Sequence, residues 1–181
     1  AESIECLKGR GPADTMEVTF ALVEQMLRLA GAAKTAAKER GHQAADHASG
    51  AALDKFRELI AEQGGDVRVV DEPERLPRAG LRQPLVASRG GFVQVVDAMG
   101  VARAALRLGA GRAKTEDAID PAVGVNELVK IGECVETGAP LAAIHANDEA
   151  ALAEAQTMLA QAITIGDTPG PVPRLLAETI E

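Results

Sequence analysis

The stretch that decides the fold covers residues 101–145 and reads VARAALRLGAGRAKTEDAIDPAVGVNELVKIGECVETGAPLAAIH. Its apolar residues recur at helical spacing up to Leu108, which predicts a short amphipathic helix. Gly109 is expected to end that helix, because glycine accepts the left-handed conformation common just past a helix C-terminus. Further on, the residues around Gly138 predict a strand, a tight glycine turn and a second, apolar strand.

The segments on either side of this stretch predict further strands and helices. Residues 85–88 and 92–96 are two β-prone runs that flank a glycine pair, a pattern typical of a β-hairpin. Asp97 is expected to cap the helix that follows, residues 150–163 predict a last helix, and Leu175-Leu176 predict a closing strand.

The first 65 residues predict a set of helices. Asp14 with Glu17 has the spacing of a capping box at the start of one of them. Its apolar stripe would normally cover a sheet, so we expect this face to self-associate or to remain mobile; the stripe is Met16, Phe20, Val23 and Leu27. Residues 32–49 are alanine-rich and helical by propensity, and a further amphipathic helix is expected to end at Gly64-Gly65.

The composition of the chain favours a soluble globular protein, with 46% hydrophobic and 25% charged residues among 181. A net charge of -8 and only 2% aromatic residues speak against nucleic acid as a partner. Cys6 and Cys134 are too few for a disulfide framework, which favours a reducing, cytoplasmic compartment. No apolar run approaches the ~20 residues that cross a bilayer, so no membrane is expected. The first seven residues look like the end of a helix, and we therefore expect the chain to begin inside a longer protein.

Two groups of residues suggest chemistry, and each also has a structural interpretation. The segment Gly109–Arg112 could hold phosphate, but phosphate loops place their glycines before a helix, and these follow one; a structural turn is therefore favoured. Asp117 and Asp120 could act as an acid–base pair or bind a hard metal ion. A solvated loop in which Asp120 caps the residues after Pro121 is favoured, because no third ligand lies nearby in sequence.

The histidines give no clear catalytic or metal signature. His42 and His47 are five residues apart and therefore lie on different faces of a helix, whereas zinc-binding pairs prefer a spacing of four. His145 ends an apolar strand without a serine or cysteine at a suggestive spacing, so a structural histidine is favoured over a general base. Walker, Gly-x-Ser-x-Gly and Cys-x-x-Cys motifs are absent from the sequence.

The two predicted hairpins also resemble the halves of a biotinyl or lipoyl carrier domain. Such carriers need a lysine at an exposed hairpin tip, and no lysine lies between Lys55 and Lys114. The fold could be shared while the carrier function is absent, because function depends on the site.

A stronger resemblance is to the C-terminal part of the pyrimidine nucleoside (thymidine) phosphorylases. It rests on Leu-Gly-Ala-Gly-Arg at 108–112, an acidic pair, Val-Gly at 123–124, and Lys-x-Gly-x-x-Val-x-x-Gly-x-x-Leu-Ala-x-Ile-His ending at His145. Similar landmarks occur in order along the chain: Glu-x-Ile-x-x-Leu at 2–7, Gln-Gly-Gly-Asp at 63–66, and Glu-Thr-Ile at 178–180.

The resemblance implies an α+β fold: trailing helices of an α/β domain, then a hammerhead-like α+β domain with a barrel-sandwich. Residues 1–70 would be the helical segment, residues 71–83 a charged, proline-bearing connector, and residues 84–181 the C-terminal phosphorylase domain. The family cleaves pyrimidine nucleosides such as thymidine or uridine with inorganic phosphate, giving the free base and (deoxy)ribose 1-phosphate.

The resemblance transfers almost no functional residue to this chain. The family's phosphate cradle, Lys-x-Gly-x-Gly-Ala, and its base-holding Arg, Ser and Lys lie upstream of the residues given, and Lys130–Cys134 breaks the cradle pattern. No catalytic or cofactor-binding residue is therefore assigned. Glu2 is the one implied metal ligand, for a structural monovalent cation. The implied whole protein is a cytoplasmic homodimer that uses nucleoside and phosphate, with this chain inactive alone; the alternative is a non-catalytic scaffold or interaction module with the same fold.

Overall fold

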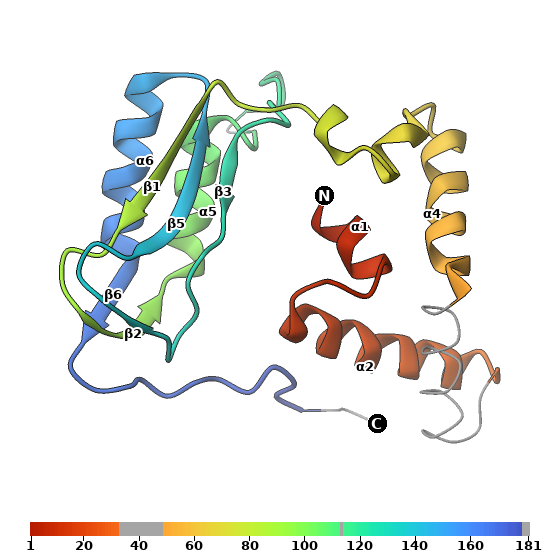
Figure 1. The fold of residues 1–181 in the computed structure, drawn as a ribbon, viewed down its shortest axis with the longest axis horizontal. Coiled ribbons are helices and arrows are strands. Elements are labelled where there is room, and N and C mark those ends of the chain that lie inside the picture. The colour runs from red at the N-terminus through yellow and green to blue at the C-terminus, as the bar shows by residue number, and fades with distance from the viewer. Residues whose placement is uncertain (33–48, 113, 179–181) are drawn as a thin grey trace. The chain divides into compact units, whose positions relative to one another are not determined.

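The computed structural model describes residues 1–32, 49–112 and 114–178 (Figure 1). They form two compact units, which divide between Leu76 and Pro77. The first unit comprises Ala1–Leu76 with the tail from Arg174, and the second comprises Pro77–Pro173. In the part of the chain that the structure describes, every helix is too short or too polar to cross a membrane.

The second unit contains two three-stranded antiparallel sheets and two helices. One sheet has the order β1-β5-β3, formed by Leu81–Val86, Pro140–Ala146 and Gly124–Asn126. The other has the order β4-β2-β6, formed by Cys134–Val135, Gly91–Val96 and Ile163–Gly166. The helices are α5 (Ala98–Leu108) and α6 (Glu149–Ala162). The predicted α+β class is confirmed; among the described residues the two sheets stay open and do not close into a barrel.

Both predicted β-hairpins are wrong. β1 and β2 follow one another in the chain but lie in different sheets, and the same is true of β4 and β5. The two connections cross from sheet to sheet together: the Ala87 N–H donates to the Ala139 carbonyl, and the Gly138 N–H donates to the Ala87 carbonyl, each at 2.8 Å. Each strand therefore pairs with a segment that is distant in sequence, and this pairing replaces the local hairpins.

Three smaller expectations are also corrected. Residues 163–166 form strand β6 on β2 rather than the end of a helix. Leu175 and Leu176 form a bend in which both side chains are exposed, not a strand. Asp14 lies in the first turn of α2 (Ala13–Leu29), where it accepts from the Thr15 N–H, and Pro12 takes the N-cap position.

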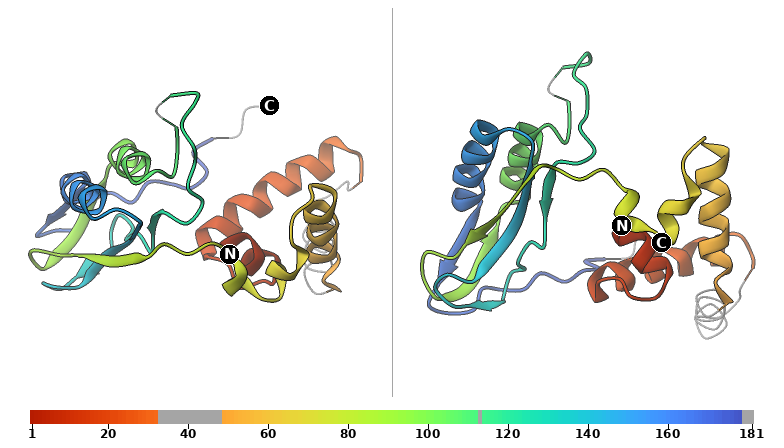
Figure 2. Two further views of the ribbon diagram at one scale, coloured as in Figure 1. Left: turned by 90° about the horizontal axis from the view of Figure 1, so that it is seen from above. Right: turned by 45° about the horizontal axis from the view of Figure 1, so that its top comes forward.

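The core of the second unit lies between α5, α6 and the sheet β1-β5-β3. Figure 2 shows the two helices side by side over one face of this sheet. Ile144 at the centre of the sheet and Leu159 of α6 are fully buried. Small residues let the helices approach: a Cβ on Gly100 would lie 2.8 Å from the Cβ of Ala162. The predicted last helix and its buried Leu159 are confirmed.

A surface ion pair joins the two helices. The Arg107 guanidinium donates to both carboxylate oxygens of Glu154, at 2.5 and 2.9 Å. These hydrogen bonds lower the pKa of the Glu154 carboxyl below its usual range. Because both side chains are exposed, the pair adds little to stability.

The first unit contains α1 (Glu2–Leu7), α2, α4 (Ala51–Glu62) and two 3-10 turns, Val67–Val70 and Pro73–Arg75. Among the described residues of this unit, Ile4 and Val70 are the buried apolar ones, and Lys8 Nζ donates to the Val70 carbonyl at 2.7 Å. The helix predicted to end at Gly64-Gly65 is confirmed as α4, followed by Gly64 at a φ of 73°.

Helix α2 is only partly buried in its unit, and the expectation that its apolar stripe self-associates or is mobile stays a prediction. The stripe around Phe20 is only half-buried, and a second apolar row on the same helix is exposed; this row is Leu22, Met26 and Leu29, with exposed fractions of 59, 67 and 88%. The helix predicted for residues 32–49 falls almost entirely outside the described residues.

We expect Leu159→Ala to lower the free energy of unfolding by about 2–5 kcal/mol, because it removes a fully buried side chain and leaves a cavity. Leu106→Ala is the control, since Leu106 of α5 is 39% exposed and should lose about 1 kcal/mol or less. Urea denaturation of both variants measures the difference. Equal losses would show that Leu159 does not anchor this core.

Candidate functional site

The glycine-rich segment after α5 is a helix-ending turn. Gly109 has a φ of 102°, a backbone conformation that side chains with a Cβ rarely adopt. Its N–H donates to the Leu106 carbonyl and the Ala110 N–H donates to the Ala105 carbonyl, at 3.0 and 3.1 Å. These N–H groups are used to close the C-terminus of the helix, so they are not aimed at an anion. The predicted turn is confirmed, and Arg112 beyond it is exposed.

The two aspartates of the following loop accept hydrogen bonds from nearby backbone N–H groups. Asp117 Oδ2 accepts from the Lys114 N–H at 2.9 Å. Asp120 Oδ1 accepts from the Ala122 N–H at 2.9 Å, so the expectation that Asp120 caps the residues after Pro121 is confirmed. These local contacts are the ones that a structural loop requires.

His145 is half-buried near the end of β5 and has a polar partner. Its Nε2 is 3.1 Å from Asn126 Oδ1, on the neighbouring strand β3. On the neighbouring strand β1, Arg82 lies opposite His145 in the strand register. The Arg82 guanidinium forms a 2.7 Å ion pair with Glu127. Because these polar groups satisfy one another, they support the interpretation of His145 as a structural histidine.

No metal centre is found among the described residues, since no three His, Cys, Asp or Glu side chains gather there. Glu2 is exposed at the first position of α1, and its role as a cation ligand stays a prediction. His42 and His47 lie outside the described residues. Cys6 and Cys134 are both free cysteines.

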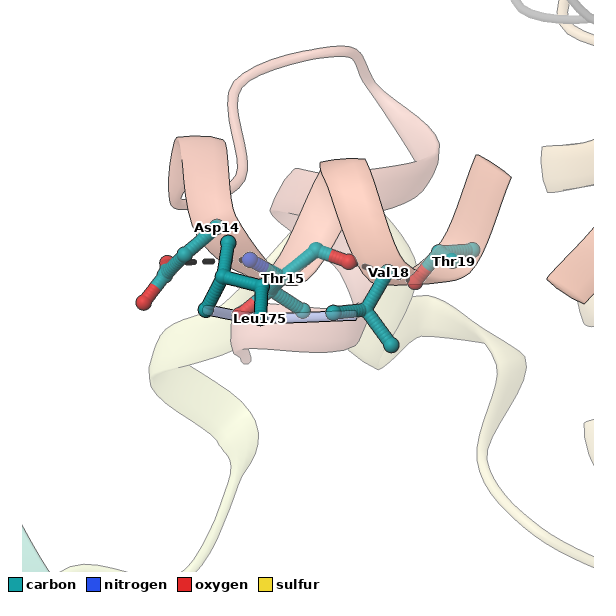
Figure 3. Close-up of a pocket in the computed structure, with 5 residues that line it drawn as sticks. All are labelled: Asp14, Thr15, Val18, Thr19 and Leu175. Carbon is teal, nitrogen blue, oxygen red and sulfur yellow. Dashed lines mark hydrogen bonds between the residues drawn. The ribbon is translucent and has the colours of Figure 1, made fainter. Parts of the chain in front are cut away.

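A shallow groove lies on α2 in the first unit (Figure 3). It has a volume of about 330 Å³ and is lined by Asp14, Thr15, Val18, Thr19 and Leu175. Its polar atoms are used locally: Thr19 Oγ1 donates to the Thr15 carbonyl at 2.7 Å and Asp14 Oδ1 accepts from the Thr15 N–H at 2.9 Å. A substrate site needs several convergent polar groups, and this mostly apolar groove does not supply them.

The fold and these contacts can be set beside known proteins. Residues 92–166, from β2 to the end of β6, match the family model of the pyrimidine nucleoside phosphorylase C-terminal domain. This chain carries that domain. The resemblance predicted from the sequence is thereby confirmed, and the matched region contains α5, the Gly109 turn, Asp120, His145 and α6.

Curated relatives extend the similarity toward both ends of the chain. The chain is 41% identical to the pyrimidine-nucleoside phosphorylase of Bacillus subtilis (strain 168) over 148 residues, 82% of this chain and 34% of the relative. It is 40% identical to the thymidine phosphorylase of Burkholderia orbicola (strain MC0-3) over 170 residues, 92% of this chain and 38% of the relative. It is 43% identical to the pyrimidine-nucleoside phosphorylase of Staphylococcus aureus (strain USA300) over 146 residues, 81% of this chain and 34% of the relative. The chain thus spans about a third of the length of these relatives.

Two asparagines that no sequence motif marks form polar contacts with the predicted site residues of this phosphorylase domain. Asn126 faces His145, and Asn147 Nδ2 donates to Asp120 Oδ2 at 2.7 Å. Neither residue belongs to a spacing motif, and only the pairing of distant strands brings them to their partners. The one available signal was their position at strand ends, where side-chain amides often replace missing ladder bonds.

We expect Gly109→Val in this phosphorylase domain to lower the free energy of unfolding by about 1 kcal/mol or more, because a side chain is strained at this positive φ. Gly90→Ala is the control: Gly90 is not among the glycines with positive φ, and its new Cβ would make ordinary contacts, the nearest at 3.5 Å. Thermal melts with and without phosphate give the readout. A Gly109 variant that keeps its stability but loses a phosphate-induced shift would indicate an anion site instead.

Proposed function

We propose that this chain is the C-terminal part of a pyrimidine nucleoside phosphorylase, and that the whole protein cleaves thymidine or uridine with inorganic phosphate. The products would be the free base and (deoxy)ribose 1-phosphate. The observation that carries this proposal is the 40–43% identity to proteins named as such phosphorylases, over 81–92% of this chain.

The reaction places two demands on the protein. Phosphate must be held beside the anomeric carbon, and the departing base must be held while charge develops on it. Both demands call for several polar or cationic groups that converge on one cavity. The described residues do not offer such a set: the turn at Gly109 uses its N–H groups for the helix end, and Arg112 is exposed.

We therefore propose that the domain supports a catalytic site built by other parts of the protein and supplies no catalytic residue itself. The acidic balance agrees with this division, because a net charge of -8 would weaken any isolated phosphate site on the chain. A cytoplasmic homodimer remains our proposal for the full-length protein, as does a structural monovalent cation held in part by Glu2.

The purified 181-residue chain is expected to release no thymine or uracil from thymidine or uridine in phosphate buffer. Activity is expected only when the remaining two-thirds found in the relatives is joined to it or supplied alongside. Chromatographic detection of the free base, with and without phosphate, measures this directly.

Arg112→Ala is the informative variant in that assay. In the reconstituted protein it should leave phosphate-dependent base release largely unchanged, because Arg112 is assigned no contact with substrate. Base release by the 181-residue chain alone, abolished by Arg112→Ala, would place the active site in this part of the protein. A reconstituted protein that folds but stays inactive would favour the non-catalytic scaffold.

A further inference from the structure

The long loop between α5 and β3, residues 109–123, is joined at its base to two distant segments of the second unit. Asn147 Nδ2 donates to Asp120 Oδ2, and Asn147 Oδ1 accepts from the Gly80 N–H, both at 2.7 Å. Asp120 Oδ1 accepts from the Ala122 N–H at 2.9 Å, and the Asp120 N–H donates to the Gly109 carbonyl at 3.0 Å. One continuous set of hydrogen bonds therefore connects the start of β1, the end of β5 and both ends of the loop.

The positions of these residues continue the order of the sheet. Leu81 pairs with Ala146, so Gly80 and Asn147 are the next residues on β1 and β5 beyond the last backbone pair. Asp120 precedes β3, the strand on the other side of β5. The contacts Gly80–Asn147–Asp120 thus extend the order β1-β5-β3 past the strand ends, with side chains in place of the backbone ladder.

We propose that Asp120 and Asn147 act as a clasp that positions the base of the loop 109–123. Both carboxylate oxygens of Asp120 and both ends of the Asn147 amide are used, so the pair leaves no unsatisfied polar group of its own. The central bond is charge-assisted and short, which makes it stronger than a neutral amide pair. Loops of this length without a helix or strand are commonly functional or mobile, and the clasp fixes the base of this one.

The two ends of the loop 109–123 pack differently from its middle. Val123 at the end of the loop is buried in the core, and Ala110 at its beginning packs against that core. The residues between them, by contrast, include Arg112, Lys114 and Glu116, which are exposed. The clasp therefore acts where the loop leaves the core. This inference does not depend on the proposed phosphorylase activity.

The test is amide hydrogen exchange of the 181-residue chain, resolved by residue with NMR. In Asn147→Asp two carboxylates would face each other without a donor, so the Asp120 and Ala122 amides should exchange roughly tenfold faster. The Ile144 amide in the core strand should keep its rate. Asn126→Asp, which changes the other asparagine at a strand end of this sheet, is the matched control and should leave the Asp120 and Ala122 amides unaffected.

A double variant distinguishes loss of the clasp from a general destabilisation of the domain. Asp120→Asn combined with Asn147→Asp exchanges the two groups, and each hydrogen bond can form again with the charge on the other residue. The clasp predicts that this swap restores the exchange rates to within about twofold of the original chain. Unchanged rates in Asn147→Asp, an equal increase at Ile144, or a swap no better than the single variant would each overturn the proposal.

Discussion

The packing of two helices onto the central strand β5 is the constraint on which the rest of the phosphorylase domain depends. In β5 four consecutive side chains, from Leu141 to Ile144, are at most 4% exposed. A strand buried on both faces needs a cover on each face, and β5 also has a neighbouring strand on each side. β1 and β3 supply the neighbours, and α5 and α6 supply one cover. Fixing β5 in this way determines where the loops at its two ends begin.

The chain changes sheets at each connection between consecutive strands, and two of these crossings lie beside each other. The connection that follows β1 and the one that precedes β5 run together and share the hydrogen bonds between Ala87 and residues 138–139. Gly91 at the start of β2 lets β6 approach closely within the second sheet, because a Cβ there would lie 2.4 Å from the Gly166 carbonyl oxygen. Local hairpins could have used the same glycine turns. They would not have placed β1 and β3 on the two sides of β5. Burying β5 stabilises the domain more than a local turn does, so the long-range pairing is the one observed.

The functional meaning of the domain follows from what its polar residues are used for. Asp117, Asp120, His145 and the Gly109 turn all carry the chemistry that suggests a site, and in the structure each of them holds backbone or a neighbouring side chain. Such side chains position loops and strand ends of the domain. This is the role proposed above for a chain that covers about a third of its phosphorylase relatives.

The sequence by itself determined the local chemistry of this chain. The Asp97 cap, the glycine at 109 that ends α5 and the helix α6 depend on residues within a few positions of one another, so spacing and residue type suffice to predict them. The family resemblance was likewise carried by short, ordered motifs. Only the tertiary structure decided which strands pair, and hence that β1 and β2 separate and that Asn126 and Asn147 meet His145 and Asp120. The reason is physical: a β-prone run can pair with any other, and the choice is made by the burial of the whole core, which no short segment encodes.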